Sequence, residues 1–205
     1  PLTVGSPFLQ TLPLDRYGLD WVHSEAVFAH PFDDGTAALL ERSVDETGRW
    51  LGEDATAWRR LHEPLVEGWD DVASDILDPI AIPRSPVLFA RFGVRALPSV
   101  QRLCGTVFDG WRAPALFAGS SAHSGIPLSS LGSSAYGMML NVSGHAVGWP
   151  IPRGGAGNIP AAMAAYFRDL GGEIEWKAPV RSLDELPESD PVLLNLTPRQ
   201  VLDIA

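Results

Sequence analysis

The chain has 205 residues, enough to bury the core of one large domain or two small ones. Its hydrophobic fraction of 45% and charged fraction of 20% are typical of a globular protein, and no apolar run approaches the ~18 residues of a membrane-spanning helix. The net charge of −10 argues against nucleic acid as the main partner, because no extended basic surface could neutralise phosphates. Cys104 is the only cysteine, so we expect no intramolecular disulfide and a cytoplasmic location.

The first part of the chain predicts strands followed by helices. Residues 19–41 contain β-favouring side chains on both sides of a hairpin turn signal at 33–35 (DDG). Ser43 is the predicted N-cap of a helix that runs to Leu51. Asp54 is the predicted cap of the next helix, in which apolar residues recur at spacings of three and four: Trp58, Leu61, Leu65, Trp69, Val72 and Ile76.

The middle of the chain predicts mainly helices. A proline-rich connection at 78–86 precedes a helix over 87–103, with a break near Pro98. This helix has an arginine side and an apolar side, formed by Arg91, Arg95 and Arg102 and by Leu88, Phe92 and Val100. The pattern is typical of a partly buried helix with a solvated arginine side, which we favour, and it also occurs in helices that lie on a membrane surface. Further helices are predicted at 114–124 and 133–144.

The last part of the chain predicts helices and strands in alternation. Asn158 is the predicted N-cap of a helix over 158–170, which ends at Gly171. Strands are predicted near 173–182 and 191–195, and Thr197 then begins a capping box.

These elements predict an α+β fold with an α/β-like C-terminal part, in which a mixed β-sheet is covered by helices. We expect a first domain over residues 1–150 and a second segment over residues 151–205.

The glycine-rich stretch at 153–158 (RGGAGN) superficially suggests a nucleotide-binding loop. A dinucleotide fingerprint needs G-x-G-x-x-G after a strand, but Gly155 and Gly157 are followed by Pro160 where the third glycine would stand. A P-loop is excluded too, because no Gly-Lys-Ser/Thr follows. Two interpretations stay open: a structural bend, or a contact to an anionic cofactor at a helix N-terminus beside Arg153.

Motifs of other enzyme classes are incomplete. The stretch at 118–125 (AGSSAHSG) lacks the G-x-S-x-G of a nucleophile elbow, which argues against a serine hydrolase. The five histidines have no spacing typical of a metal site. Among them, His123 and His145 lie among small residues that suit a cavity wall.

Six stretches together carry a resemblance to a known family: SPF (6–8), GLDWVHSEAVFAHPFDDG (18–35), AGSSAHS (118–124), GHAVGWPIPRGGAGNIPAAMAAYFRDLGGEI (144–174), APVRSLDELP (178–187) and VLLNLTPRQVL (192–202). In this order they resemble FAD-dependent oxidoreductases of the phytoene-dehydrogenase-like type, within the flavin amine oxidase superfamily. The most specific part is P-x-G-G followed by L-G-G-E-I and a valine. The resemblance covers essentially the whole chain.

The resemblance implies that the chain is the substrate-domain portion of a two-domain flavoprotein. Members of this family begin with a βαβ unit that carries G-x-G-x-x-G and end with a second glycine-containing FAD segment, and these 205 residues contain neither. The chain also begins with Pro1 rather than Met. We therefore expect it to be a piece of a longer protein, and not to hold FAD by itself.

The resemblance also implies which residues contribute to function. It places cofactor contacts at the backbone of Val180 and at the glycine stretch, by Arg153, Gly154 and Gly155. The candidates for the wall of a substrate cavity are Trp149, His145 and His123. The implied reaction is hydride transfer from a hydrophobic small-molecule substrate to the flavin. Because the cofactor carries this chemistry, no residue is assigned as catalytic. No metal is expected, because the histidines lack the spacing of a metal site.

An alternative function is a non-catalytic module that binds an apolar ligand or a protein and retains the fold. For a chain without its nucleotide domain we expect exposed apolar surface that favours a homodimer, and contact with a membrane surface is a further expectation from the helix at 87–103.

Overall fold

The computed structural model describes residues 1–77, 82–186 and 191–205. They divide into two compact units, unit 1 (Pro1–Ala162) and unit 2 (Met163–Ala205), and each is described by itself. The division lies inside helix α9 (Asn158–Asp169), compared with the boundary after residue 150 expected from the sequence. The connection expected at 78–86 lies partly outside the described residues, as does the end of the stretch at 178–187.

The fold is α+β, as predicted, because helices dominate and the described strands form two antiparallel pairs. β1 (Trp21–Val22) pairs with β4 (Ile151–Pro152), and β2 (Phe28–Pro31) pairs with β3 (Ala37–Leu40). All strand pairing in the described ranges is antiparallel, rather than the mixed sheet that the sequence suggested. The strands are two to four residues long, and β2 and β4 each end at a proline, which cannot donate to a ladder.

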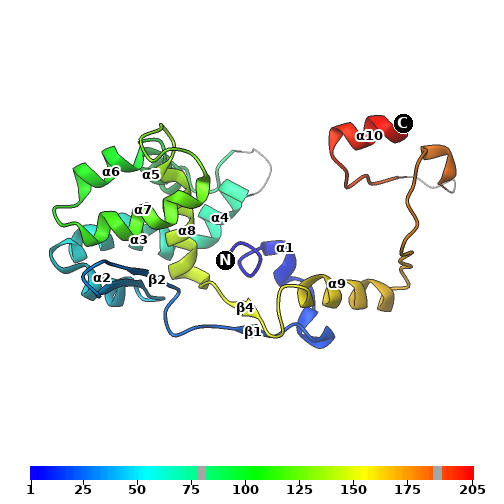
Figure 1. Ribbon diagram of the computed structural model, residues 1–205, viewed down its shortest axis with the longest axis horizontal. Coiled ribbons are helices and arrows are strands. Elements are labelled where there is room, and N and C mark those ends of the chain that lie inside the picture. The colour runs from blue at the N-terminus through cyan, green and yellow to red at the C-terminus, as the bar shows by residue number, and fades with distance from the viewer. Residues whose placement is uncertain (78–81, 187–190) are drawn as a thin grey trace. The chain divides into compact units, whose positions relative to one another are not determined.

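Helices make up most of unit 1, and Figure 1 shows several of them beside α8. Their bounds are α1 (Pro7–Gln10), α2 (Val44–Leu51), α3 (Ala55–Glu67), α4 (Trp69–Leu77), α5 (Pro86–Ala96), α6 (Val100–Val107), α7 (Arg112–Ser121) and α8 (Ser134–Val147), with short 3-10 helices at Leu14–Tyr17, Gly52–Asp54 and Ala122–Ser124 (η3). α8 packs against α3, α5 and α7. The fully buried side chains include Trp58, Leu65, Phe117, Met138 and Val142.

Two glycines let neighbours approach α8 closely. A Cβ at Gly144 would lie 2.6 Å from Leu40 Cδ2, and one at Gly137 would lie 2.9 Å from Phe117 Cε1. Distances below 3.0 Å are essentially never seen for a real Cβ, so both positions require glycine unless the neighbour shifts.

Most local predictions for unit 1 are confirmed. Ser43 caps α2 by accepting from Glu46 N–H at 3.3 Å, and the helix predicted over 87–103 breaks at Pro98 into α5 and α6. The prediction that Asp54 caps α3 is wrong. Its buried carboxylate instead accepts the N–H groups of Asp109 at 2.8 Å and Gly110 at 3.1 Å, which fixes the loop before α7.

The helix predicted from residue 54 onward is interrupted at Gly68, which separates α3 from α4. Leu88 packs directly against this glycine, so a side chain would collide with it. Of the predicted apolar stripe, Trp58, Leu61, Leu65, Trp69 and Val72 are buried.

Unit 2 contains the end of α9, a 3-10 helix at Leu183–Glu185 and α10 (Pro198–Ile204). The capping box of α10 is confirmed, because Thr197 Oγ1 accepts from Gln200 N–H and Gln200 Oε1 accepts from Thr197 N–H. The strands expected near 173–182 and 191–195 are not formed. A strand needs a neighbour to complete its hydrogen-bond ladder, and no other described segment pairs with these residues.

Candidate functional site

A pocket of about 320 Å³ in unit 1 brings together three of the stretches that carry the family resemblance. We call it the His123–Trp149 pocket. Its lining comes from β2, from the end of α7 and η3, and from the residue after the C-cap of α8: Phe28, Ala29, His30, Gly119, Ser120, His123 and Trp149. The structure therefore brings together two of the three predicted cavity-wall residues, His123 and Trp149.

Aromatic contacts hold the walls of this pocket. The ring centroids of Phe28 and Trp149 lie 5.0 Å apart, and His123 meets Trp149 edge to face at 6.2 Å. Such tilted and edge-to-face arrangements are the favoured ones for aromatic pairs. The indole of Trp149 therefore joins the wall from β2 to the wall from η3.

Two glycines determine where His30 and Trp149 lie in the pocket. A Cβ at Gly119 would lie 2.6 Å from His30 Nδ1, so the His30 ring fits against α7 only because residue 119 has no side chain. Gly148 has φ of 77°, in the left-handed region where glycine is favoured, and this conformation ends α8 and redirects the chain into Trp149.

The C-terminal end of α8 is held by Arg42, which follows β3. Its guanidinium donates to the carbonyl groups of His145 at 3.1 Å, Ala146 at 2.8 Å and Val147 at 3.3 Å. These are the carbonyls that a helix leaves without partners at its end, and a cation there is also stabilised by the helix dipole. Arg42 thus fixes the position from which Trp149 enters the pocket.

The lining of the pocket is mainly apolar and includes two imidazole groups, those of His30 and His123. Ser120 is nearly fully buried, and its hydroxyl donates to Phe117 O at 2.9 Å, so it is not a free nucleophile. No Asp or Glu belongs to the lining found for the described residues. No group of three or more potential metal ligands occurs in the described parts of the chain either. The pocket is therefore suited to bind and desolvate an apolar molecule, with His30 and His123 as its hydrogen-bonding groups.

His145 lies outside this pocket, in the core between α8 and α3. Only 3% of its surface is exposed, and its Nε2 accepts from Trp58 Nε1–H at 3.1 Å. Burial lowers the pKa of His145 to about 4, partly opposed by the main-chain carbonyls of Glu41 and Arg42, whose geometry falls short of a hydrogen bond to Nδ1. The ring is neutral at pH 7 and anchors α8 to Trp58.

His62 stands beside His145, with 5.8 Å between the ring centroids. It is fully buried, and its Nδ1 lies 3.0 Å from Trp58 O, which only a protonated Nδ1 can satisfy. Burial, followed by the proximity of His145, lowers the pKa of His62 to about 3. These two histidines and Trp58 form a buried polar cluster of the core, and no sequence signal predicts it beyond the helical spacing of residues 58 and 62.

The glycine stretch forms a self-contained turn between β4 and α9. Gly154 and Gly155 have φ of 82° and 108°, and Gly155 N–H donates to Pro152 O at 2.9 Å. Asn158 begins α9, and its side-chain amide donates back to Arg153 O at 2.5 Å instead of capping the helix. The N–H groups of Asn158 and Ile159 are bonded within the turn as well, so these donors are not free to cradle a phosphate.

Arg153 is tied to the strand pair rather than projecting freely. Its Nε lies 2.5 Å from Asp20 Oδ2, and its backbone N–H donates to Asp20 O at 2.8 Å. Both side chains of this ion pair are more than half exposed, at 70% and 58%. The geometry therefore favours the structural bend over an anion contact made by the turn itself, and the assignment of Arg153, Gly154 and Gly155 to a cofactor stays a prediction.

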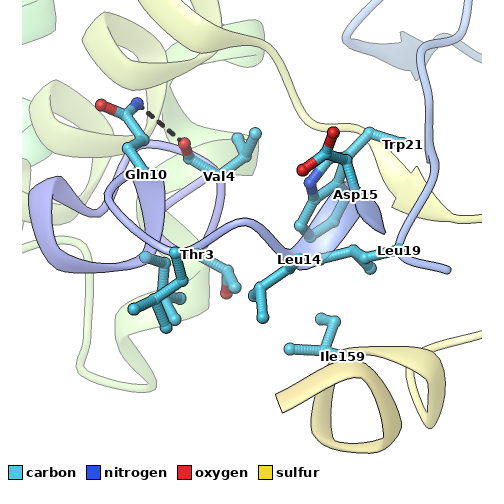
Figure 2. A pocket seen from close by; sticks show the side chains of 10 residues that line it. Thr3, Val4, Gln10, Leu14, Asp15, Leu19, Trp21 and Ile159 are labelled. Carbon is cyan, nitrogen blue, oxygen red and sulfur yellow. Dashed lines mark hydrogen bonds between the residues drawn. The ribbon is translucent and has the colours of Figure 1, made fainter. Parts of the chain in front are cut away.

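A second pocket, of about 310 Å³, lies beside this turn in unit 1 (Figure 2). Leu14, Leu19, Trp21 and Ile159 make its lining largely apolar, and Asp15 adds a carboxylate. Gln10 closes one side by donating to Val4 O at 3.0 Å. An apolar lining with a carboxylate does not attract a phosphate, which agrees with the self-contained geometry of the neighbouring turn.

Val180 belongs to unit 2 and lies in an extended segment without helix or strand. Its side chain is 40% exposed and lines a groove of about 450 Å³ with residues such as Leu186 and Leu194. Its backbone N–H and C=O make no hydrogen bond to another described residue. Within the described residues both groups are without a partner, as a cofactor contact through the Val180 backbone would require.

Sequence reasoning missed Phe28, His30 and Gly119 as parts of the pocket. The first two lie in a stretch that it used only for the resemblance and for strands. Gly119 has the signal of a glycine in a helix interior, which costs stability unless packing requires it. Arg42 was missed as well, since its contacts lie more than 100 positions away in the sequence.

A family model for flavin containing amine oxidoreductase matches residues 81–203. The match contains all seven residues that the sequence singled out for cofactor or substrate contacts. No curated protein and no solved structure matches the chain. Among the described helices, none is long and apolar enough to cross a membrane.

Proposed function

The chain belongs to the family of flavin-containing amine oxidoreductases, and from this premise we propose that it is the substrate-binding part of an FAD-dependent oxidoreductase of the phytoene-dehydrogenase-like type. The observation that supports this most directly is the His123–Trp149 pocket. It is built from three stretches that resemble that type of enzyme, although they lie far apart in the sequence. The substrate proposed for this pocket is a hydrophobic small molecule.

The proposed role of the pocket follows from its lining. Phe28 and Trp149 provide apolar faces that exclude water from a bound substrate. His123 and His30 are the side chains that can orient a polar group of the substrate by a hydrogen bond. His145 is too deeply buried for this, and we assign it instead to positioning α8.

The family implies a flavin cofactor, and we propose FAD. A bound flavin would supply the acceptor for a hydride from the substrate. The described residues fit such a cofactor in part. Among the described residues the Val180 backbone makes no hydrogen bond, whereas the N–H groups of Gly155, Asn158 and Ile159 are bonded within the glycine turn. We therefore expect that this turn alone does not hold the diphosphate of FAD, and that the 205-residue chain alone does not retain FAD.

The pocket is tested by the binding of an apolar polyene dye, 1,6-diphenylhexatriene, followed by its fluorescence. Trp149→Ala removes the ring that joins the two walls, so we expect the dye to bind at least tenfold more weakly. Trp176→Ala is the matched control, because Trp176 is 74% exposed and lies in unit 2. Equal affinity of the wild type and Trp149→Ala would refute the assignment of the substrate to this pocket.

The cofactor is tested on the longest reading frame that contains this chain. Purification with bound FAD, and bleaching of the flavin absorbance by a polyene substrate without oxygen, would support the oxidoreductase. A protein that carries no flavin and cannot be reconstituted with FAD would overturn it. That outcome together with retained dye binding would identify a non-catalytic binding module.

A further inference from the structure

Helix α5 has two apolar faces, and only one of them is covered. Phe92 and Ala96 are buried at 8% and 7% exposure, and this face packs against α8. Val87, Val94 and Leu97 point the other way and are 78%, 65% and 63% exposed. Their spacing of seven and three residues places them on one side of the helix. The sequence left open whether this helix is partly buried or lies on a membrane surface, and its predicted apolar side did not include Val87, Val94 or Leu97.

The exposed face continues beyond the helix. Gly132 N–H donates to Leu97 O at 2.7 Å, which brings the loop before α8 to the end of α5. Leu131, next to that glycine, is 81% exposed. Ser134 Oγ is within 2.8 Å of Arg95 O and 2.6 Å of Pro98 O, so this junction is firmly held. We call the surface formed by Val87, Val94, Leu97 and Leu131 the α5 patch.

Two arginines stand beside the α5 patch on the same helix. Arg91 lies three residues before Val94 and Arg95 lies directly after it, and both are exposed. Arg91 makes one long hydrogen bond, 3.4 Å, to Arg60 O. No acidic residue occurs between residues 82 and 108, whereas the chain as a whole carries a net charge of −10. Asp75 of α4 accepts the N–H groups of Arg84 and Ser85, just before α5.

An exposed apolar face with a cationic border is complementary to a bilayer that contains anionic lipid. We infer that the α5 patch docks on such a membrane surface, with Val87, Val94, Leu97 and Leu131 in the boundary between headgroups and acyl chains and the arginines among the lipid phosphates. A second copy of the chain is a poorer occupant. In a two-fold symmetric contact the arginines around one patch would meet the same arginines of the other.

The experiment is flotation of the 205-residue chain with vesicles of pure phosphatidylcholine or of equal parts phosphatidylcholine and phosphatidylglycerol. We expect binding to the anionic vesicles only, and weaker binding as salt screens the charges. Val87→Ser combined with Val94→Ser and Leu97→Ser should reduce partitioning at least tenfold. Arg91→Gln with Arg95→Gln should reduce it by roughly fivefold for each arginine. Phe8→Ser is the control, since Phe8 is 65% exposed on α1, and it should bind like the wild type.

The substituted side chains are exposed, so the variants should keep the helical circular dichroism of the wild type. The proposal is overturned if the wild type does not float with anionic vesicles or floats equally with neutral ones. It is also overturned if the triple serine variant floats like the wild type. A dimer that this triple variant converts to monomer, without vesicle binding by either, would assign the patch to a second copy instead.

Discussion

The two units of the chain differ in what their apolar side chains have to pack against. Unit 1 buries a continuous core around α8, including Trp58 and Phe117 at 0% exposure. In the described residues of unit 2, no side chain is buried, and Leu193 is 90% exposed. Both units nevertheless form the helices that their sequences predict. The difference shows that helices arise here from local signals, whereas a core and a sheet require partners distant in the sequence.

The largest expected effect concerns the buried histidines of unit 1. His62 and His145 have pKa values of about 3 and 4 in the folded chain and about 6.5 when unfolded. The unfolded state therefore binds more protons below pH 6.5, and stability is lost as the pH falls through this range. Each histidine should contribute a loss of about 1.4 kcal/mol per pH unit.

Urea unfolding at pH 7, 6 and 5 measures this loss. His62→Phe fills the same space without a titrating group, so it should roughly halve the slope with pH. The exposed His123, replaced by Asn, should leave the slope unchanged. An unfolding midpoint that does not move between pH 7 and pH 5 would contradict the neutral state of the buried pair.

The close packing of α8 predicts the next largest effect. Gly144→Ala places a methyl group 2.6 Å from Leu40 Cδ2, and overpacking of this kind costs about 1–3 kcal/mol. Gly93→Ala is the matched substitution in α5, where a Cβ meets nothing within 4 Å. It should stabilise the chain by up to about 1 kcal/mol, because alanine is the better helix former. Thermal unfolding of both variants decides this, and a neutral or stabilising Gly144→Ala would show that α8 can shift.

A smaller effect is expected in unit 2, at the capping box of α10. Thr197→Ala removes the hydroxyl that accepts Gln200 N–H, which costs the helix about 1 kcal/mol. Because no described residue of unit 2 is buried, the thermal midpoint of the core of unit 1 should not change. Faster amide exchange confined to residues 198–204 is the expected result, and a lowered global midpoint would mean that the two units unfold together.

The smallest effect is expected at the glycine turn. Arg153 and Asp20 form an exposed ion pair, and such pairs contribute between about 0 and 1 kcal/mol. Arg153→Gln should therefore lower the urea midpoint only slightly. Screening of the ion pair by 1 M salt should lower the midpoint of the wild type by a similar amount. A loss beyond this range would show that Arg153 does more than hold the turn to the strand pair.

Features that depend on neighbouring residues could be predicted from the sequence, whereas those with distant partners could not. The caps at Ser43 and Thr197 and the break at Pro98 depend on neighbours within four residues, and these predictions are confirmed. Asp54 has the sequence context of a cap, but its carboxylate is used by a loop 55 positions later. A partner this far away in the sequence cannot be predicted from the residues around Asp54.

The candidate site shows the same limit. His123 and Trp149 were found because their stretches resemble a family, whereas His30 and Phe28 enter the pocket through the pairing of β2 with β3 and the packing of α7 on the hairpin. The strands expected near 173–182 and 191–195 have suitable residues but no partner in the described chain. The pattern of side chains favours a strand, but a strand forms only when another segment pairs with it.

Arg42 connects two of the elements that carry the walls of the pocket. It stands two residues after β3, and its guanidinium grips the last turn of α8, from which Trp149 emerges. The β2–β3 hairpin carries Phe28 and His30, so Arg42 connects the two elements that bring Phe28 and Trp149 into contact. Arg42 therefore links the β2–β3 hairpin to the end of α8 at a point outside the pocket, and a substitution there would alter the spacing of Phe28 and Trp149 without touching the lining.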